Sequence, residues 1–334
     1  MVNNNCQDST NEKTGKDQNV SHEMCSSDLF FDNLIWLTTK EAALFLNRAT
    51  FGPTEKDINL LVSKNTYENW VNEQFNTRPT YHLPLVKSLA TKMCSDRNDA
   101  GELVVDSWEI QYPRHQVWWE AAIGAEDQLR QRVALALSEI LVISDSPGLG
   151  LNEFQLGMTS YYDVLVKHAF GNYRDLLEEI TLHPNMGDFL SMSRNQKSNE
   201  EGTIRPDENY AREVMQLFTI GLNELNLDGT EKLDANNNII PTYDNLDISE
   251  FSKIFTGLTW GDQEYFGRGI LLETSYLYSM KMFNEYHEPG AKQLLNGQAV
   301  ADRDPVDGNA DISEALDNLF QHPNIGPFIS KLLI

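Results

Sequence analysis

Residues 202–221 constrain the fold of this chain more than any other segment, because they have the pattern of one helix with a single apolar face. Pro206 suits the first helical position, where its missing N–H would have no intrahelical partner, and Gly221 suits the left-handed stop. Asp207 and Glu208 place negative charge at the positive end of the helix dipole. At 3.6 residues per turn, one face carries Tyr210, Ala211, Val214, Met215, Leu217 and Phe218. The segment therefore predicts a helix packed on a core.

The opposite face of this helix is polar and carries Glu208, Asn209, Arg212, Glu213, Gln216 and Thr219. One interpretation is a solvated face with an ion pair between Glu208 and Arg212, four residues apart. The other is a site in which Glu208 or Glu213 acts as acid or base and Arg212 binds an anionic group. A concave pocket on this face, with His287 across from it, would favour the second interpretation.

A second polar group follows an aromatic segment at residues 260–286 and consists of His287, Glu288 and Lys292. These side chains are candidate acid–base or ligand groups, and a surface turn is the alternative. The candidate catalytic residues of the sequence are therefore Glu208, Asn209, Arg212, Glu213, His287, Glu288 and Lys292. The cofactor is left open, and none of these residues is assigned as a metal ligand.

Composition limits the partners of the chain. With 334 residues and 40% hydrophobic content it can bury a large core. Its 26 basic and 50 acidic residues give a net charge of −24, which repels phosphate backbones, so we expect no nucleic-acid partner. No apolar run reaches the roughly 20 residues that a membrane helix needs. Cys6, Cys25 and Cys94 have no metal spacing, although Cys6 and Cys25 can pair outside the cell.

Periodicity predicts a mainly α fold, built as one large helical domain over residues 29–334 after a disordered lead-in at residues 1–28. Thr38 and Glu41 fit a capping box, Thr54 fits the cap of a second helix, and a third is expected around Trp70. A further helix is expected from Pro113 to Gly124. Short strands are expected around residues 260–287.

An internal repeat indicates duplicated helix–turn–helix units. Residues 175–191 align without gaps on residues 314–330 through His-Pro-Asn-x-Gly-x-Phe-x-Ser. Proline ends the first helix of each unit at His183 and His322. We expect these histidines to bond free carbonyls at the helix end, with ligand binding as the alternative.

Two carboxylates outside the candidate site are given structural roles. Glu139 lies in an apolar helical stretch seven residues after Arg132, so we expect a structural pair between them. Asp311 or Ser313 is expected to cap the helix that follows.

Five strings resemble the bacterial domain-of-unknown-function 1800 family: residues 46–53 (LNRATFGP), 129–139 (LRQRVALALSE), 174–177 (RDLL), 206–213 (PDENYARE) and 290–292 (GAK). The resemblance spans nearly all of the chain after the lead-in, and the PDENYARE string is its most specific part. It implies a mainly helical, exported bacterial protein whose biochemical role is not established. Many members resemble one another through a Trp-His-x-His-Phe run, in which Ser138 and Ile140 replace the histidines here.

The resemblance implies export to the periplasm, cell surface or exterior, although residues 1–28 contain no apolar signal-peptide core. Members of the family also resemble one another beyond residue 334, and residues 328–334 look like a helix start without an end. We therefore expect a C-terminally incomplete domain.

Three functions follow from these patterns. The first is an enzyme acting on a cell-envelope or extracellular polymer through a Glu/Arg/His site. The second is a non-enzymatic binding or assembly module for an envelope protein or polymer. The third makes the polar face of the helix in residues 202–221 an internal ion-pair network that orients helices.

Overall fold

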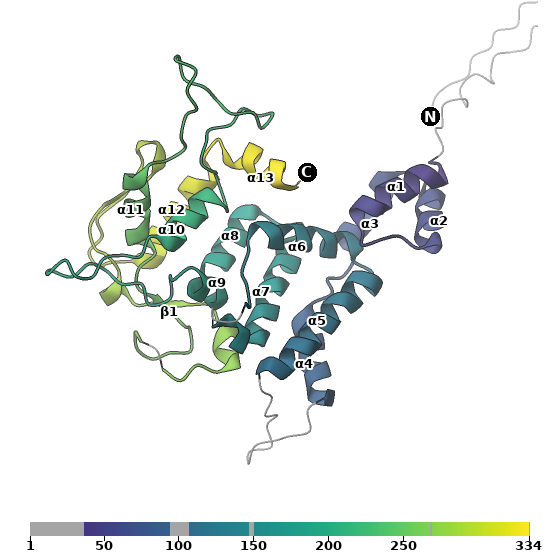
Figure 1. Ribbon diagram of the computed structural model, residues 1–334, viewed down its shortest axis with the longest axis horizontal. Coiled ribbons are helices and arrows are strands. Elements are labelled where there is room, and N and C mark those ends of the chain that lie inside the picture. Colours follow the sequence, from purple (N-terminus) through teal and green to yellow (C-terminus); the bar gives the residue numbers. More distant parts are fainter. Residues whose placement is uncertain (1–36, 94–106, 147–149, 268, 334) are drawn as a thin grey trace, which may run out of the picture.

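The computed structural model describes residues 37–93, 107–146, 150–267 and 269–333. The lead-in at residues 1–28 and the three cysteines, Cys6, Cys25 and Cys94, lie outside these ranges. The described part is mainly helical, as predicted, with thirteen α-helices and two small two-stranded sheets (Figure 1). None of the described helices combines the length and the apolar character that crossing a bilayer requires.

The N-terminal helices form a small group at one end of the molecule, with an apolar cluster of their own (Figure 1). They are α1 (Thr39–Ala49), α2 (Glu55–Lys64) and α3 (Tyr67–Asn76). The Thr38 and Thr54 side chains cap α1 and α2 in capping boxes, as the sequence predicts. The cluster forms where Leu46, Leu61 and Trp70 meet.

Four helices follow and pack against one another: α4 (His82–Met93), α5 (Ser107–Gly124), α6 (Gln128–Ile140) and α7 (Gln155–His168). Helix α5 begins before Pro113, which lies inside it rather than at its start. The expected pair between Arg132 and Glu139 on α6 does not form among the described residues. Both side chains are exposed, and the Arg132 guanidinium lies 5.7 Å from the centre of the Phe51 ring.

The repeated motif forms two helix–turn–helix units, α8 (Tyr173–Thr181) with α9 (Pro184–Phe189) and α12 (Gly308–Phe320) with α13 (Ile325–Leu333). The histidine side chains accept an N–H group at the turn instead of bonding carbonyls of the first helix, and His183 is thereby the N-cap of α9. The N–H of Asn185 donates to His183 Nδ1 at 3.3 Å, and the N–H of Asn324 donates to His322 Nδ1 at 3.2 Å. Proline removes one N–H at each turn, and the imidazole accepts the next free one.

Arg174 joins the two units across the pseudo-repeat. Its Nε donates to Asp317 on α12 at 2.6 Å, and its NH2 donates to the carbonyl of Ser313 at 3.1 Å. The same guanidinium bonds Glu178 within α8 at 2.6 Å. This arginine belongs to one of the five strings that carry the family resemblance, and its role here is to hold α8 against α12.

Helix α10 (Asn209–Gln216) is shorter than predicted at both ends. The N–H of Asp207 donates to Asn195 Oδ1 at 2.8 Å, which holds Asp207 outside the helix together with Pro206. After Gln216 the backbone passes into wider turns, in which the N–H groups of Phe218 and Ile220 donate to the carbonyls five residues earlier, and it ends at Gly221, which has the expected left-handed conformation with φ 69°.

The change of geometry after residue 216 reverses two predicted orientations on this segment. Leu217, predicted to be buried, is 40% exposed, and Thr219, predicted to be polar and exposed, is buried.

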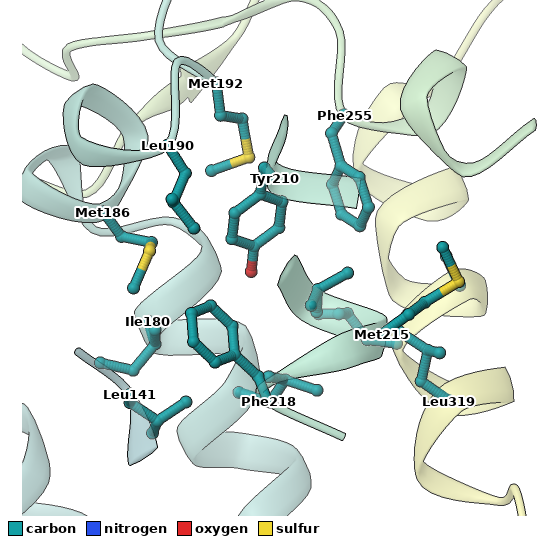
Figure 2. Packing of buried hydrophobic residues seen from close by; sticks show 14 of the residues in the cluster. Leu141, Ile180, Met186, Leu190, Met192, Tyr210, Met215, Phe218, Phe255 and Leu319 are labelled. Carbon is teal, nitrogen blue, oxygen red and sulfur yellow. The ribbon is translucent and has the colours of Figure 1, made fainter. Parts of the chain in front are cut away.

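The largest apolar cluster forms around α10 (Figure 2). The ring of Tyr210 lies between Met192 and Leu190 on one side and Phe255 on the other, while Phe218 points toward Leu141 and Ile180 (Figure 2). The Tyr210 hydroxyl is 2.7 Å from the hydroxyl of Thr181 on α8. Phe255 directly follows α11 (Asn245–Ile254).

Short elements complete the chain, as expected for residues 260–287. Strand β1 (Leu258–Thr259) pairs antiparallel with β2 (Lys281–Met282), and β3 (Lys292–Gln293) pairs with β4 (Ala299–Val300). Single 3₁₀ turns lie at η1 (Leu151–Glu153), η2 (Glu273–Leu277), η3 (Asn284–Tyr286) and η4 (Leu295–Gly297).

Candidate functional site

The seven candidate residues of the sequence fall into two groups that do not share a site. In the first group, Arg212 on α10 forms the predicted ion pair with Glu208 at 3.0 Å. Their side chains are 40% and 45% exposed, so the pair contributes no more than about 1 kcal/mol to stability. Asn209 starts the helix, and its N–H donates to Asp207 Oδ1 at 2.8 Å.

Glu213, on the same face, lies in an environment that perturbs its ionisation. Burial raises its pKa, and the nearby Arg212 guanidinium partly opposes that effect. Burial also raises the pKa of Tyr243, and the charge of Glu213 adds to the shift. The Tyr243 hydroxyl is buried and has no hydrogen-bond partner among the described residues.

The second group is a buried network centred on Asp311 of α12. Its Oδ2 accepts a hydrogen bond from Lys292 Nζ at 2.5 Å and lies 3.1 Å from His287 Nε2. The Lys292 side chain is 2% exposed. Arg303 bonds the other oxygen of Asp311 and also reaches Glu314.

Both ring nitrogens of His287 have partners in this network. Thr256 O, a carbonyl, lies 2.9 Å from His287 Nδ1, so Nδ1 carries a proton. His287 Nε2 lies nearer to Asp311 Oδ2, at 3.1 Å, than to Lys292 Nζ, at 3.4 Å. Burial alone would raise the pKa of Asp311, but hydrogen bonds from His287 and Lys292 outweigh it and lower that pKa.

Sequence reasoning missed the central residue of this network. The sequence predicts Asp311 or Ser313 as the cap of α12, but Asp307 caps it by accepting the N–H of Ala310 at 3.2 Å. Asp311 lies one turn later and points into the protein, where it is 3% exposed. The spacing of Lys292, Arg303 and Asp311 along the chain follows no helix or strand period, because the three residues come from a strand, a loop and a helix.

Glu288 also has a structural partner, since its Oε2 accepts the N–H of Ser198 at 2.7 Å. In the described part of the chain, no hydrogen bond or ion pair joins the α10 group to His287, Glu288 or Lys292. His287 is 1% exposed and held on both ring nitrogens. His287 is thus buried beside Asp311, and its hydrogen bonds to the described residues do not reach the polar side of α10.

A pocket of about 270 Å³ lies elsewhere, between α4, α5, α6 and α7, and we call it the α5–α7 pocket. Its polar lining residues are His82, Arg114, His115, Ser138, Glu139 and Thr159. Its aromatic lining residues are Trp118, Tyr161 and Tyr162. A concave space with apolar walls and a few convergent polar groups is the usual form of a small-molecule site.

His82 is fixed in one tautomer by its neighbours. Gln131 Nε2 donates to the carbonyl of Thr80 at 2.9 Å and to Asp127 at 3.1 Å, so Gln131 Oε1 faces His82. That oxygen accepts from His82 Nε2 at 3.0 Å, which leaves Nδ1 unprotonated in a neutral ring. Burial lowers the pKa of His82, which keeps the ring neutral.

Arg114, which also lines the α5–α7 pocket, bonds three neighbouring side chains. Its Nε donates to Gln155 Oε1 at 2.7 Å, and its guanidinium is paired with Asp145. Its NH2 also donates to His115 Nε2 at 3.0 Å, so His115 is neutral and protonated on Nδ1. Burial and then the charge of Arg114 lower the pKa of His115. The pocket thus holds two neutral imidazoles.

The remaining walls are set by α6 and α7. The Tyr161 hydroxyl donates to the carbonyl of Leu141 at 2.7 Å, which ties the two helices together at the base of the pocket. The Tyr162 ring lies 4.9 Å from the ring of His82, and burial raises the pKa of Tyr162 to about 12. Glu139 lines the pocket and is exposed, so its carboxylate is open to a ligand.

None of the seven sequence candidates lines this pocket. Its residues come from four helices, and each helix shows mainly its apolar periodicity in the sequence. Ser138 lines the pocket, while Ile140, the other position at which the family resemblance leads one to expect histidine, is buried at 7% exposure. In the described ranges, no three or more His, Cys, Asp or Glu side chains are grouped to hold a metal ion.

Fold and pocket define this protein as a mainly helical domain with a ligand-sized space between its central helices. Residues 44–334 match the family model described as "Protein of unknown function (DUF1800)", so the chain belongs to the DUF1800 family. No curated protein and no solved structure matches the chain.

Proposed function

We propose that this protein is an exported enzyme that binds one unit of an uncharged envelope or extracellular polysaccharide in the α5–α7 pocket. A single observation supports it most. A neutral His82, whose Nδ1 is free of hydrogen bonds to the described residues, lines the same space as the Glu139 carboxylate. A positioned neutral imidazole is the commonest general base in enzymes.

The polymer class follows from charge and shape. A net charge of −24 repels polyanions, which favours a neutral chain. Trp118 and Tyr162 offer flat apolar surfaces to the faces of sugar rings, while Arg114, Ser138 and Glu139 offer donors and acceptors to hydroxyl groups. At about 270 Å³ the pocket is at the small end of ligand sites, which suits one sugar unit.

The reaction we propose is hydrolysis. His82 Nδ1 takes a proton from a water molecule as its oxygen attacks the linkage carbon, and a second water molecule on the opposite face protonates the departing sugar oxygen. The hydroxide left by that second water then recovers the proton from His82. Glu139 hydrogen-bonds a hydroxyl of the bound unit and orients it. In the net reaction one water molecule is consumed, one linkage is broken, and each of the two new chain ends carries a hydroxyl group.

The test combines gel retardation in soluble neutral polysaccharides with an assay for released reducing ends. The panel is hydroxyethyl cellulose, xyloglucan, starch and chitin oligosaccharides, with polygalacturonate as the anionic control. Glu139→Gln and His82→Asn should lower turnover by about 10²-fold or more, with Glu126→Gln, an exposed glutamate outside the pocket, as the matched control. Ser138→Phe should fill the pocket and abolish retardation. A lack of both retardation and cleavage across the panel would refute the proposal.

A binding module is the second candidate, and the outer face of α5 favours it. Tyr112, Trp119 and Ile123 share that face and are 77%, 61% and 80% exposed. The rings of Trp119 and Trp118 are in contact at 5.0 Å, so this exposed face continues into the pocket. Retardation without release of reducing ends, lost in Trp119→Ala, would select this function over the enzyme.

Export is tested by fractionating cells that express the full-length gene. The protein should be recovered from the periplasm, the cell surface or the medium. Recovery from the cytoplasm alone would show that the export part of the proposal is wrong.

A further inference from the structure

Asp127 occupies the N-cap position of α6 but does not cap that helix. Aspartate is preferred at such positions because its side chain accepts an N–H group of the first helical turn. Asp127 makes no such hydrogen bond, although it is 0% exposed. One of its carboxyl oxygens, Oδ1, has no hydrogen-bond partner in the described part of the chain. A buried carboxylate that gives up its usual local bonds calls for another explanation.

The other oxygen of Asp127 bonds two groups that lead toward the α5–α7 pocket. Asp127 Oδ2 accepts the N–H of Thr80 at 2.9 Å and a side-chain N–H of Gln131 at 3.1 Å. Its paired cation, Arg130, approaches the same oxygen only to 3.9 Å, and the guanidinium lies 4.5 Å from the centre of the Phe170 ring. Arg130 therefore balances the charge of the carboxylate without competing for the two hydrogen bonds.

Gln131 is oriented by two acceptors on one side of its amide group. Its Nε2 lies 2.9 Å from the carbonyl oxygen of Thr80 and 3.1 Å from Asp127 Oδ2. Neither a carbonyl nor a carboxylate donates a hydrogen bond, so a flipped amide would place Oε1 against both oxygens. The amide oxygen is thereby held toward His82, where it accepts from Nε2 at 3.0 Å.

The geometry points to Asp127 as a positioning residue for His82. Acting through Gln131, Asp127 keeps the imidazole proton on Nε2 and leaves Nδ1 as the basic nitrogen on the side of the α5–α7 pocket. Neither Asp127 nor Gln131 belongs to the described lining of the pocket, so the bonded Nε2 is directed away from it.

The same pair of α6 residues also fixes the backbone before His82. Asp127 holds the N–H of Thr80 and Gln131 holds its carbonyl, two residues before the histidine. The position of the imidazole ring and the position of its proton therefore have a common origin. The catalytic importance of Nδ1 rests on the proposed function, whereas the tautomer is a property of the protein without a ligand.

The tautomer is measured by ¹H–¹⁵N correlation NMR of the 334-residue chain with ¹⁵N-labelled histidine. His82→Asn removes one of the seven histidine signals and so assigns that of His82. The wild type should show a protonated Nε2 and an unprotonated Nδ1 at neutral pH. Gln131→Met keeps most of the side-chain volume but removes the acceptor, so the His82 signals should become those of a tautomer mixture. Asp127→Ala should shift them in the same direction, because Gln131 then loses one of its two acceptors.

Turnover and titration separate positioning from simple support of the fold. If the proposed hydrolysis holds, a folded Gln131→Met variant should lose about tenfold or more in turnover, because the basic nitrogen is no longer fixed. Asp127→Asn keeps an acceptor for Thr80 and Gln131, so it should retain the tautomer and lose much less turnover than Asp127→Ala.

Asp127→Asn also removes a charge near the imidazole. Burial lowers the pKa of His82, and the hydrogen bond to Gln131 and then the charge of Asp127 oppose this shift. The pKa of His82 in an NMR titration should therefore fall in Asp127→Asn, because a negative charge nearby favours the imidazolium. Glu126→Gln, at the exposed neighbouring position, is the matched control and should leave the tautomer unchanged.

The inference is overturned by a wild-type His82 whose Nδ1 carries the proton, or by an unchanged tautomer in folded Gln131→Met and Asp127→Ala variants. Equal losses of turnover in Asp127→Asn and Asp127→Ala would also overturn it. If no polysaccharide of the panel is cleaved, the hydrolase proposal fails, and the NMR measurement alone decides for or against the role of Asp127.

Discussion

At the scale of single residues, Asp163 on α7 is a carboxylate whose ionisation the fold opposes. Its two oxygens accept the N–H groups of His82 and Leu83 at 2.6 and 2.9 Å, and so cap α4 from another helix. Burial nevertheless raises its pKa to about 6. The side chain that starts α4, and so positions His82, therefore titrates in a physiologically accessible range.

The pH dependence follows from the sign of this shift. The folded pKa lies above the ordinary value of 3.8, so the folded state holds the proton more tightly. The resulting stabilisation is complete below about pH 4 and is lost as the pH rises through about 6. As the pH rises from 4 to 7, the free energy of unfolding of Asp163→Asn should therefore increase by about 1–3 kcal/mol relative to that of the wild type. The weaker cap lowers the stability of the variant by a constant amount at every pH.

Urea unfolding of both proteins across this pH range measures the difference. Asp175→Asn, at an exposed aspartate on α8, is the matched control. A difference between wild type and Asp163→Asn that stays constant from pH 4 to pH 7 would contradict the prediction.

At the scale of elements, the repeated helix–turn–helix units depend on a histidine that caps a helix. His183 is buried, its ring packs edge-on against Tyr161 at 5.2 Å, and burial lowers its pKa to about 3. A low pKa suits this role, because Nδ1 accepts a hydrogen bond only when it is unprotonated.

His183→Asn should keep an acceptor at the cap of α9 and lose mainly packing, whereas His183→Ala should lose both. We expect His183→Ala to cost about 2–4 kcal/mol of unfolding free energy and His183→Asn to cost less. Chemical unfolding at pH 7 ranks the two variants against the wild type. Equal losses in both variants would show that the imidazole contributes through packing alone.

At the scale of the whole molecule, the Asp311 network joins segments that are distant in sequence. His287 bonds the end of α11 through Thr256, Lys292 lies on β3, and Asp311 lies on α12. The sequence analysis weighed an internal ion-pair network for the polar face of α10, whereas a buried network is found among His287, Lys292 and Asp311.

Lys292→Met should destabilise the fold by about 2–4 kcal/mol, because Asp311 then keeps Arg303 and His287 but loses its shortest buried partner. Asp311→Asn in the same background should restore part of this loss. A double-mutant cycle from thermal unfolding should give a coupling energy above about 1 kcal/mol. A coupling near zero would mean that the two side chains act independently.

Local rules in the sequence determined the helical elements of this protein. The capping boxes at Thr38 and Thr54, the helix of Tyr210 and Val214, and the repeated His-Pro-Asn units depend on contacts within a few residues, and they form as expected. Boundaries moved where a distant partner competed, as when Asn195 holds Asp207 outside α10.

The tertiary structure decided where chemistry can take place. Glu208 and Arg212 are neighbours on one helix, and their pairing needed no further information. His82, His115 and Glu139 lie on three helices, and nothing in their spacing along the chain shows that they line one pocket. His287 and Lys292 looked like site residues because polar types are conspicuous in a sequence, but burial beside Asp311 gives them structural partners. Periodicity reports which face of a helix is apolar, whereas the meeting of polar groups from different helices depends on how those helices pack.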